Sequence, residues 1–393
     1  MTKKALRARV VYPVAAPPIE DGLVVFEEGR VTRIGRQAPA DVEVEDLGDV
    51  ALLPGLVNAH CHLEFSGLRR KVGRTGLPLP AWIRQVIEKR PAGKKVGKAI
   101  EDGLEESLVS GVTTVAEICR TETDAYRIEG QAPRLLLLQE SIGFSQARAG
   151  SALNAAENRL EELHALVDPK PNGAANGHNA NGASNGSGGR GSNGQGSNGH
   201  GPNGVASYAD AIFADPDRPG SPNDWFRIGV SPHAPYTASP QLIRELVSVA
   251  IENEMPVAMH LAESPEELQL LAEGKGPFQE ILEERGMWDP WVIGRGSAPL
   301  DYLRMLTRAP KALVVHGNYL DHSELAMMGR HGGAMSLCYC PRTHAHFKHK
   351  PYPLAEALEL GVRVCLGTDG RGSTPDLSML EEMREAHAKH PHV

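Results

Sequence analysis

The chain has 393 residues with ordinary globular usage, 41% hydrophobic and 23% charged, which suits two or three domains or one large barrel with additions. Its 41 basic and 49 acidic residues give a net charge of −8, which argues against a nucleic-acid groove as the main binding surface. Three features predict a cytoplasmic protein. The five cysteines are irregularly spaced, no segment has the pattern of a signal peptide, and no apolar run approaches the ~20 residues of a membrane span.

The first fifty residues show the pattern of short strands. Apolar runs over residues 6–11, 23–26 and 31–34 are separated by turns that contain Pro17 and Gly29. Because no helical period appears there, residues 1–53 are predicted to form a small β domain.

From residue 51 onward, short apolar runs alternate with helical patterns. The eight runs cover residues 51–57, 112–115, 135–138, 227–230, 256–261, 312–315, 334–338 and 362–366. The clearest helical patterns include 100–109, 242–251 and a short one at 354–358. Strands that alternate with helices predict parallel pairing, and eight of them fit an α/β fold of the (β/α)₈ TIM-barrel type over residues 54–393. A doubly wound sheet is the alternative on this pattern alone.

One segment within the predicted barrel has a different composition. Residues 171–204 contain twelve Gly and eight Asn in 34 positions and no Leu, Ile, Phe, Tyr or Trp. Such a segment buries too little apolar surface to offset its ordering entropy. It is predicted to be a disordered surface insertion, with a partner-binding loop as the alternative.

In an α/β barrel, the catalytic and substrate-binding side chains lie at the C-terminal ends of the strands. Five of the eight predicted strands are followed by His or Asp, at His60 and His62, His233, His260, His316 and Asp369. The ends of the strands are therefore the predicted place of the active site.

The spacing of His60 and His62 places both imidazoles on one face of a strand. Neutral imidazoles so placed suit a zinc-like ion, although two ordinary polar residues at a strand exit would show the same pattern. His260 and Asp369 offer two further ligands of the right type. Three imidazoles and one carboxylate leave a position for water, as a hydrolytic site requires.

Three further side chains near the strand ends are ambiguous when each is taken alone. Glu263 is either a carboxylate at a helix N-terminus or a proton shuttle beside the water of the ion. His316 is either a core histidine or a second proton-handling group. His233, beside Pro232, fits an ordinary loop histidine when taken alone.

Five motifs in order complete this pattern. They are PGLVNAHCH at 54–62, SPHAPYT at 231–237, HLAE at 260–263, HG at 316–317 and GTDG at 367–370. Together they resemble the metal-dependent amidohydrolase superfamily, in particular its deaminases and chlorohydrolases of nucleosides, nucleobases and triazines. The resemblance covers residues 1–388 apart from the insertion.

The resemblance implies a distorted (β/α)₈ barrel with a small β-sandwich built from both chain ends. Since the chain stops at Val393, that sandwich is expected to be incomplete. The ligands of one divalent ion, zinc first and iron second, would be His60, His62, His260 and Asp369. The strand over 227–230 has no lysine of the kind that bridges two ions in binuclear relatives.

The same resemblance gives catalytic roles to Glu263, His316 and Asp369 and a substrate contact to His233. Further candidates for the substrate pocket are Glu64, Trp82 and Arg342, with Phe65, Glu140 and Tyr236. Arg342 lies in CPRTHAHF at 340–347, where many relatives carry a different segment, and it would favour an anionic group.

The implied activity is hydrolysis of a non-peptide C–N bond in a small molecule. We expect deamination of an aminated heterocycle such as an adenosine-like nucleoside or aminodeoxyfutalosine. The alternatives are a chlorohydrolase or amide hydrolase with the same site, or a catalytically silent metal-binding relative. Relatives are often homo-oligomers, and no nucleic-acid or membrane partner is expected.

Overall fold

The computed structural model describes residues 3–120, 123–127, 131–167 and 226–393. The predicted insertion at 171–204 lies outside these ranges. The described residues form two compact units, one that ends at Pro54 and one that begins at Gly55. Among the described helices, none has the length and apolar character needed to span a bilayer.

The N-terminal unit is a five-stranded sheet. Its strands are β1 (Lys4–Val11), β2 (Ile19–Glu27), β3 (Arg30–Gly35), β4 (Glu43–Asp46) and β5 (Ala51–Leu52). Their order is β3-β2-β1-β4, and β5 also pairs with β1. Leu23 and Val25 are buried with Ala5, and Val24 belongs to a second small cluster, as the two-residue period of a strand requires. The first three strands were predicted, whereas exposed, acidic β4 has no apolar pattern.

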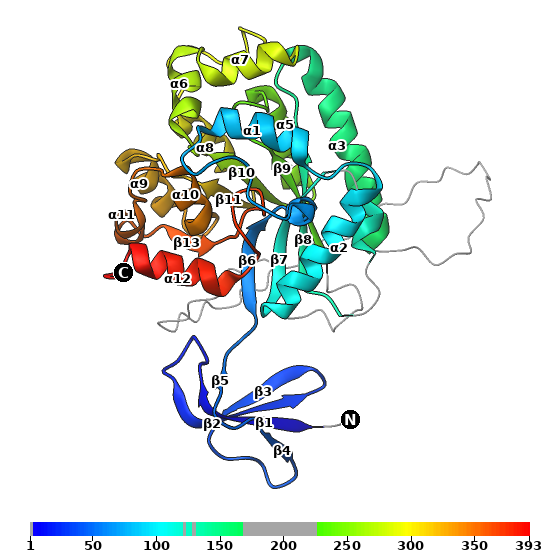
Figure 1. Cartoon of the computed structure of the whole chain (residues 1–393), viewed down its shortest axis with the longest axis vertical. Coiled ribbons are helices and arrows are strands. Elements are labelled where there is room, and N and C mark those ends of the chain that lie inside the picture. The colour runs from blue at the N-terminus through cyan, green and yellow to red at the C-terminus, as the bar shows by residue number, and fades with distance from the viewer. Residues whose placement is uncertain (1–2, 121–122, 128–130, 168–225) are drawn as a thin grey trace, which may run out of the picture. The chain divides into compact units, whose positions relative to one another are not determined.

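Eight parallel strands form the sheet of the second unit (Figure 1). They are β6 (Leu56–Cys61), β7 (Val112–Cys119), β8 (Arg134–Ser141), β9 (Phe226–Pro232), β10 (Pro256–Leu261), β11 (Lys311–His316), β12 (Met335–Tyr339) and β13 (Arg363–Leu366). Each strand pairs with its neighbour in the sequence, and a bridge between Cys61 and Asp369 joins the two ends of the sheet. The predicted (β/α)₈ barrel is confirmed, and the doubly wound alternative is excluded.

One predicted strand divides in two. The run over 51–57 contributes β5 to the N-terminal sheet and β6 to the barrel. Pro54 lies between the two strands, and because a proline has no N–H to donate to a ladder, it interrupts the pairing.

Helices surround the barrel strands, as Figure 1 shows. They are α1 (Leu79–Lys89), α2 (Lys94–Val109), α3 (Gln146–Val167), α5 (Pro240–Glu252), α6 (Pro265–Glu273), α7 (Pro277–Glu284), α8 (Pro299–Leu306), α9 (His322–Arg330), α10 (Pro341–Phe347), α11 (Leu354–Glu359) and α12 (Met379–Lys389), with 3₁₀ turns η1 (Leu63–Gly67) and η2 (Thr123–Tyr126). In α5, the Ser239 hydroxyl accepts from the Leu242 N–H and so caps the helix, and Leu246 is among the residues of its buried face. In α2, Val109 ends the apolar helical pattern that was predicted over 100–109, but it is 82% exposed as the last residue of the helix.

Alternate residues of the barrel strands fill two cores. Leu136 and Leu138 of β8 belong to the cluster inside the barrel, together with Ala258, Val315 and Cys338. Their neighbours Leu135 and Leu137 belong to the larger cluster beneath the helices. A parallel strand buried on both faces therefore reads as a continuous apolar run, which explains why the sequence predicts these strands well.

The barrel closes through polar contacts at the ends of β6 and β13. Asn58 Nδ2 donates to Thr368 Oγ1 (2.8 Å), and the Thr368 N–H donates to Asn58 Oδ1 (3.0 Å). The Asp369 N–H donates to the His60 carbonyl at 3.1 Å. This seam holds His60 and Asp369, from opposite ends of the sequence, side by side.

Candidate active site

The predicted ligand residues meet at the C-terminal ends of the barrel strands. His62 Nε2 lies 3.4 Å from His260 Nε2. Asp369 Oδ1 lies 3.7 Å from both His60 Nε2 and His62 Nε2. Among the described residues, two overlapping groups have ligand atoms close enough to share an ion: His60, His62 and Asp369, and His60, His260 and His316.

The chemistry of this cluster fits a divalent ion. His60 is fully buried, and neither of its ring nitrogens has a hydrogen-bond partner in the described structure. Burial lowers the pKa of His60 and His62 well below the usual value and that of His260 to about 4, so all three imidazoles are neutral. Neutral imidazole is the form that ligates a metal. An unpartnered acceptor nitrogen inside a set of three imidazoles and one carboxylate is what a zinc-like ion satisfies.

The His260 ring is oriented by the neighbouring strand. The His233 carbonyl accepts from the protonated Nδ1 of His260 at 2.9 Å. That bond fixes the tautomer and leaves Nε2 of His260 free to face His62.

Glu263 and His316 lie beside the cluster, on the same side of the barrel. Glu263 Oε1 is 3.6 Å from His316 Nε2, and the Tyr236 hydroxyl is 3.5 Å from Glu263 Oε2. Burial, and then the nearby Asp369, raise the pKa of Glu263 well above its usual value. Burial likewise lowers the pKa of His316. The pair therefore favours a protonated carboxyl beside a neutral imidazole, which is an arrangement that can give and receive a proton.

Three residues at the site have left-handed backbone conformations. Ala262, His316 and Asp369 have φ angles of 53°, 68° and 56°. Non-glycine residues adopt such angles at a cost of about 1–3 kcal/mol each, and they cluster at functional sites. Each lies at the exit of a barrel strand, where the turn aims a side chain across the barrel opening.

The strained turn at Ala262 is held by a buried carboxylate. Glu267 Oε1 accepts from the Ala262 N–H (2.8 Å), and Oε2 accepts from the Glu263 N–H (2.9 Å). Asn318 Nδ2 donates to the Glu263 carbonyl at 2.9 Å. Glu267 is fully buried, so both backbone N–H groups depend on it. Glu267 thus supports the position of Glu263 without touching the cavity.

Replacing Glu267 by leucine should destabilise the protein. The change leaves two buried N–H groups without acceptors, each at a cost of roughly 1–3 kcal/mol, so we expect the free energy of unfolding to fall by at least about 2 kcal/mol. Urea unfolding monitored by circular dichroism measures this, with Glu266→Leu on the same turn as the control. An unfolding free energy like that of the control would contradict the role given to Glu267.

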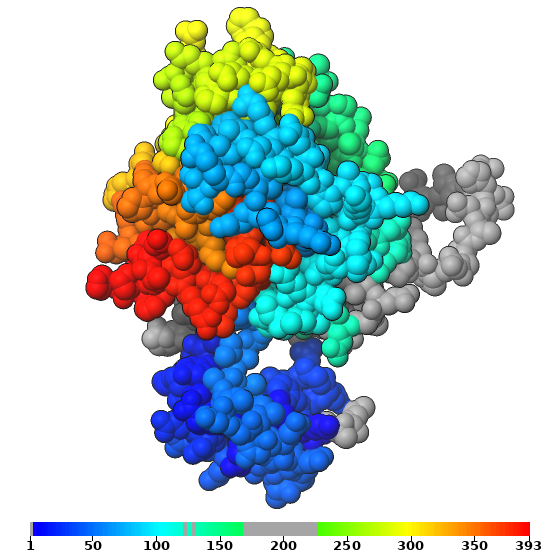
Figure 2. Space-filling view, in the orientation of Figure 1, coloured from blue at the N-terminus to red at the C-terminus, as the bar shows by residue number. Residues whose placement is uncertain are grey.

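A cavity of about 330 Å³ opens above the cluster. His62, His260, Glu263, His316 and Asp369 line its floor. Its outer wall comes from α1 and α7, which lie against each other and are joined by a two-pronged ion pair between Arg84 and Glu284 (2.8 and 2.9 Å). Figure 2 shows the segment of α1 on the molecular surface beside that of α7. The wall is apolar, with Leu79, Trp82, Ile83, Val86, Ile87, Phe278, Ile281 and Leu282.

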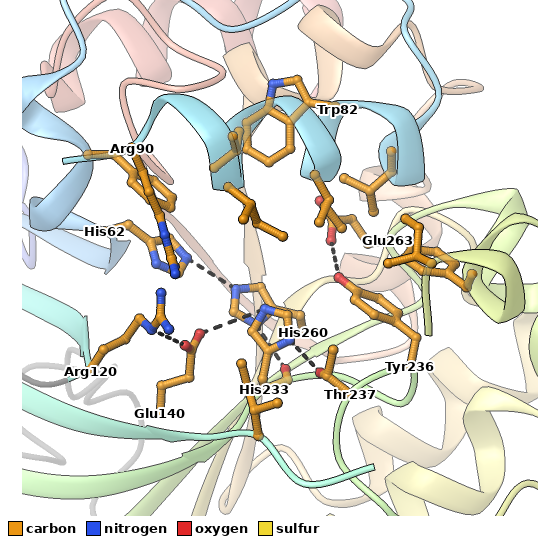
Figure 3. Close-up of a pocket in the computed structure, with 18 of the residues that line it drawn as sticks. His62, Trp82, Arg90, Arg120, Glu140, His233, Tyr236, Thr237, His260 and Glu263 are labelled. Atoms are coloured by element: carbon orange, nitrogen blue, oxygen red, sulfur yellow. Dashed lines mark hydrogen bonds and ion pairs between the residues drawn. The ribbon is translucent and has the colours of Figure 1, made fainter. Parts of the chain in front are cut away.

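The opposite wall of the cavity is polar (Figure 3). Arg120 Nε lies 3.1 Å from Glu140 Oε2, and Arg120 Nη1 lies 3.6 Å from Glu64 Oε1. His233 Nδ1 is 2.6 Å from Thr237 Oγ1. Burial lowers the pKa of His233 to about 3, so the ring is neutral. These residues offer both donors and acceptors to a bound molecule.

The structure brings most of the predicted substrate residues to this cavity and excludes one. Glu64, Trp82 and His233 line it, as do Phe65, Glu140 and Tyr236. Arg342 does not, and its prediction needs correction. Its guanidinium lies 2.6 Å from Glu382 Oε1 and 2.7 Å from Asp376 Oδ1 and also donates to the Asp376 carbonyl at 2.9 Å. These bonds turn Arg342 toward the last helix, where it fixes the chain beyond β13.

Sequence reasoning missed several residues of the cavity. Arg120 directly follows β7, so the position after a barrel strand was a usable signal for it. Arg90 and Arg285 end α1 and α7, and no motif points to either. The apolar faces of these two helices resemble ordinary core-facing helices in sequence.

Comparison with known proteins agrees with this geometry. The model of the amidohydrolase family matches residues 51–178 and 220–392. The chain belongs to the amidohydrolase family. The 5-methylthioadenosine/S-adenosylhomocysteine deaminase of Natronomonas pharaonis is 26% identical to this amidohydrolase over 384 residues, which cover 96% of this chain and 71% of the relative.

Two solved structures share the fold of this amidohydrolase. One is Helicobacter pylori aminofutalosine deaminase in complex with methylthio-coformycin, which aligns with a TM-score of 0.75 and 20% sequence identity. The alignment covers 99% of this chain and 82% of the chain of that deaminase. An adenosine deaminase from Xanthomonas campestris with bound zinc has a TM-score of 0.67 and 22% identity, with coverages of 99% and 74%.

Proposed function

We propose that this amidohydrolase is a zinc-dependent deaminase that hydrolyses the exocyclic C–N bond of an aminated, adenosine-like heterocycle. One observation carries the proposal: the buried Glu263 carboxyl, in an environment that favours its protonated form, faces a cavity beside the His/Asp cluster. A purely structural ion needs no such acid. The activities named for the relatives support an aminated nucleoside as substrate. A cytoplasmic location and a homo-oligomeric assembly, both expected in the sequence analysis, are part of this proposal.

The zinc ion would be held by His60, His62, His260 and Asp369. When bound, it supplies Lewis acidity that lowers the pKa of a water toward about 7. Asp369 accepts the proton of the attacking water, and the Ser373 hydroxyl steadies it by donating to Oδ2 at 3.1 Å. A C–O bond forms at the ring carbon that carries the amino group.

Glu263 and His316 stabilise the charge that develops on the substrate in this reaction. Glu263 donates its proton to the ring nitrogen next to the attacked carbon, so that negative charge does not accumulate there. His316, 3.6 Å from Glu263, stabilises the developing tetrahedral centre. The proton taken up by Asp369 passes to the amino group, the C–N bond breaks and ammonia leaves. The hydroxyl proton of the tetrahedral centre returns to Glu263, which leaves a carbonyl at the ring carbon. The polar wall formed by His233, Glu140 and Glu64 orients the heterocycle.

An assay of ammonia and chloride release by the zinc-loaded chain tests the proposal. The panel contains adenosine, 5-methylthioadenosine, an aminated pterin and an aminated and a chlorinated triazine. Ammonia release from the adenosine-type substrates is the expected result. Chloride release from the chlorinated triazine with no ammonia would identify a chlorohydrolase instead. A zinc-loaded chain that releases neither would overturn the deaminase proposal.

A further inference from the structure

The positive charge of this chain is concentrated in one stretch of its sequence. Residues 68–98 contain ten Lys or Arg and a single acidic residue, Glu88, and therefore carry a net charge of +9. The rest of the chain has 31 basic and 48 acidic residues and carries −17. Because like charges that are held close together repel one another, such a stretch is typical of a surface that meets an anion.

Part of this stretch lines a groove of about 920 Å³. The end of α1, the first half of α2, the turn η1 and the turn beyond β13 contribute to it. Six of its lining residues are cationic: Arg69, Lys89, Arg90, Lys95, Lys98 and Arg371. Among the described residues of the lining, only Arg90 also lines the active-site cavity. The groove is therefore a separate concavity.

Three exposed cations of the groove have no acidic partner. Within the described ranges, Arg69, Lys89 and Lys95 form no ion pair. The acidic residues of the lining are Glu88 and Asp102, and Asp102 already lies 2.8 Å from a lysine of the same helix. The lining thus keeps an excess of positive charge that the described part of the protein does not neutralise.

Two further polar residues of the groove are held in place by the fold. Ser66 in η1 is 6% exposed, and its hydroxyl has no hydrogen-bond partner among the described residues. Arg371 Nη1 lies 3.2 Å from Glu106 Oε2 of α2, whereas the buried Nε of Arg371 donates to no described atom. Buried polar groups of a folded protein are seldom left unpaired. The groove therefore combines exposed cations with donors in fixed positions.

We propose that this groove binds an oligophosphate chain, such as that of a nucleoside triphosphate, outside the active site. Lys95 and Lys98 lie three positions apart on one face of α2, so their ammonium groups can meet successive phosphoryl groups. Arg69 and Arg371 add planar guanidiniums, each of which matches two phosphate oxygens. A monoanion would neutralise only part of this charge, and the flat surface of a bilayer does not enter a concavity. The site does not depend on the deaminase function.

Uridine nucleotides test the proposal, because uridine has no exocyclic amino group for the active site to remove. Calorimetric titration of the zinc-loaded protein at low salt should show binding of uridine 5′-triphosphate (UTP), weaker binding of the monophosphate and none of uridine. Added salt should weaken the binding of UTP, since it screens the charges of an exposed groove. Arg69→Gln/Lys95→Gln should raise the Kd for UTP at least about tenfold, because two charge-assisted contacts are lost.

The matched control is Arg70→Gln/Lys94→Gln. It removes the same two residue types from neighbouring exposed positions that do not line the groove, so the net charge changes equally. Its Kd for UTP should stay within about twofold of the wild-type value, since screening weakens charges that make no direct contact. Failure of UTP to bind, binding of uridine as tight as that of UTP, or equal losses in the two double variants would overturn the proposal.

Two further measurements distinguish the groove from other places where an anion could bind. UTP should slow amide hydrogen exchange in residues 66–69 and 89–98, which carry the groove. Slower exchange in α7 instead would place UTP in the active-site cavity and refute the site. Binding of a short oligouridylate or of anionic phospholipid vesicles by a protein that does not bind UTP would identify a macromolecular partner and likewise refute it.

Discussion

Glutamine at position 263 should leave zinc bound and remove almost all turnover. We expect Glu263→Gln to lower kcat by about 10²–10⁴-fold, the usual contribution of a positioned acid–base group. Glutamine keeps the size of the side chain, but its amide cannot give a proton to a ring nitrogen. Because Glu263 lies beside the ligand cluster without belonging to either ligand group, zinc content should stay near one per chain. Steady-state ammonia release and elemental analysis of the same sample measure both quantities.

Glu266→Gln provides the control for this experiment. Glu266 lies on the first turn of α6, three residues further along, and does not line the cavity. It should retain wild-type turnover. Near-normal turnover in Glu263→Gln would show that another group supplies the proton and would withdraw the role proposed for this carboxyl.

Alanine at position 60 should remove both the ion and the activity. His60 is the one residue that belongs to both candidate ligand groups, and its two ring nitrogens have no other partner in the described structure. Its loss removes a ligand and a fully buried imidazole at the seam of the barrel. We expect less than about 0.1 zinc per chain and a fall in kcat/KM of at least about 10³-fold, since lost ligands weaken both binding and Lewis-acid catalysis. Elemental analysis after dialysis against zinc-free buffer measures the first quantity.

A second buried histidine distinguishes ligand loss from general damage. His346 on α10 is also buried, with both ring nitrogens unpartnered in the described structure, yet it belongs to neither ligand group. His346→Ala should keep its zinc. If both variants lose the ion, the cause is disturbed packing and the ligand assignment has no support. If His60→Ala keeps a full equivalent, the assignment is wrong.

The barrel and the meeting of the candidate ligand residues at its strand ends could be predicted because each leaves a local signal. Strands such as β8, with Leu135–Leu138, are continuous apolar runs. His60 lies near the end of another strand, β6, and His62 directly follows it. The order of strands in a parallel barrel then brings their ends together, so that residues such as Asn58 and Thr368, 310 positions apart, meet without any local cue to their contact.

The walls of the cavity could not be predicted in the same way. The apolar side chains of α1 have the period of any helix that faces a core, and only the tertiary structure shows that they face a cavity. The error at Arg342 has a similar origin. Because Arg342 lies close to a strand end, it was predicted to contact the substrate. Its guanidinium instead binds the buried carboxylate of Glu382, 40 residues later in the sequence. An ion pair between residues this far apart leaves no recognisable pattern in the sequence.

The seam between β6 and β13 has a mechanical consequence for the barrel. Neighbours such as β8 and β9 share a continuous parallel ladder, whereas β6 and β13 meet through a single bridge and the bonds of Asn58, His60, Thr368 and Asp369. An ion held by His60 and His62 on one side and by Asp369 on the other would act as a cross-link between the two ends of the sheet. Chelation should therefore loosen the barrel where it closes, and amide hydrogen exchange should accelerate first in Leu56–Cys61 and Arg363–Leu366, long before the helices that carry the apolar wall.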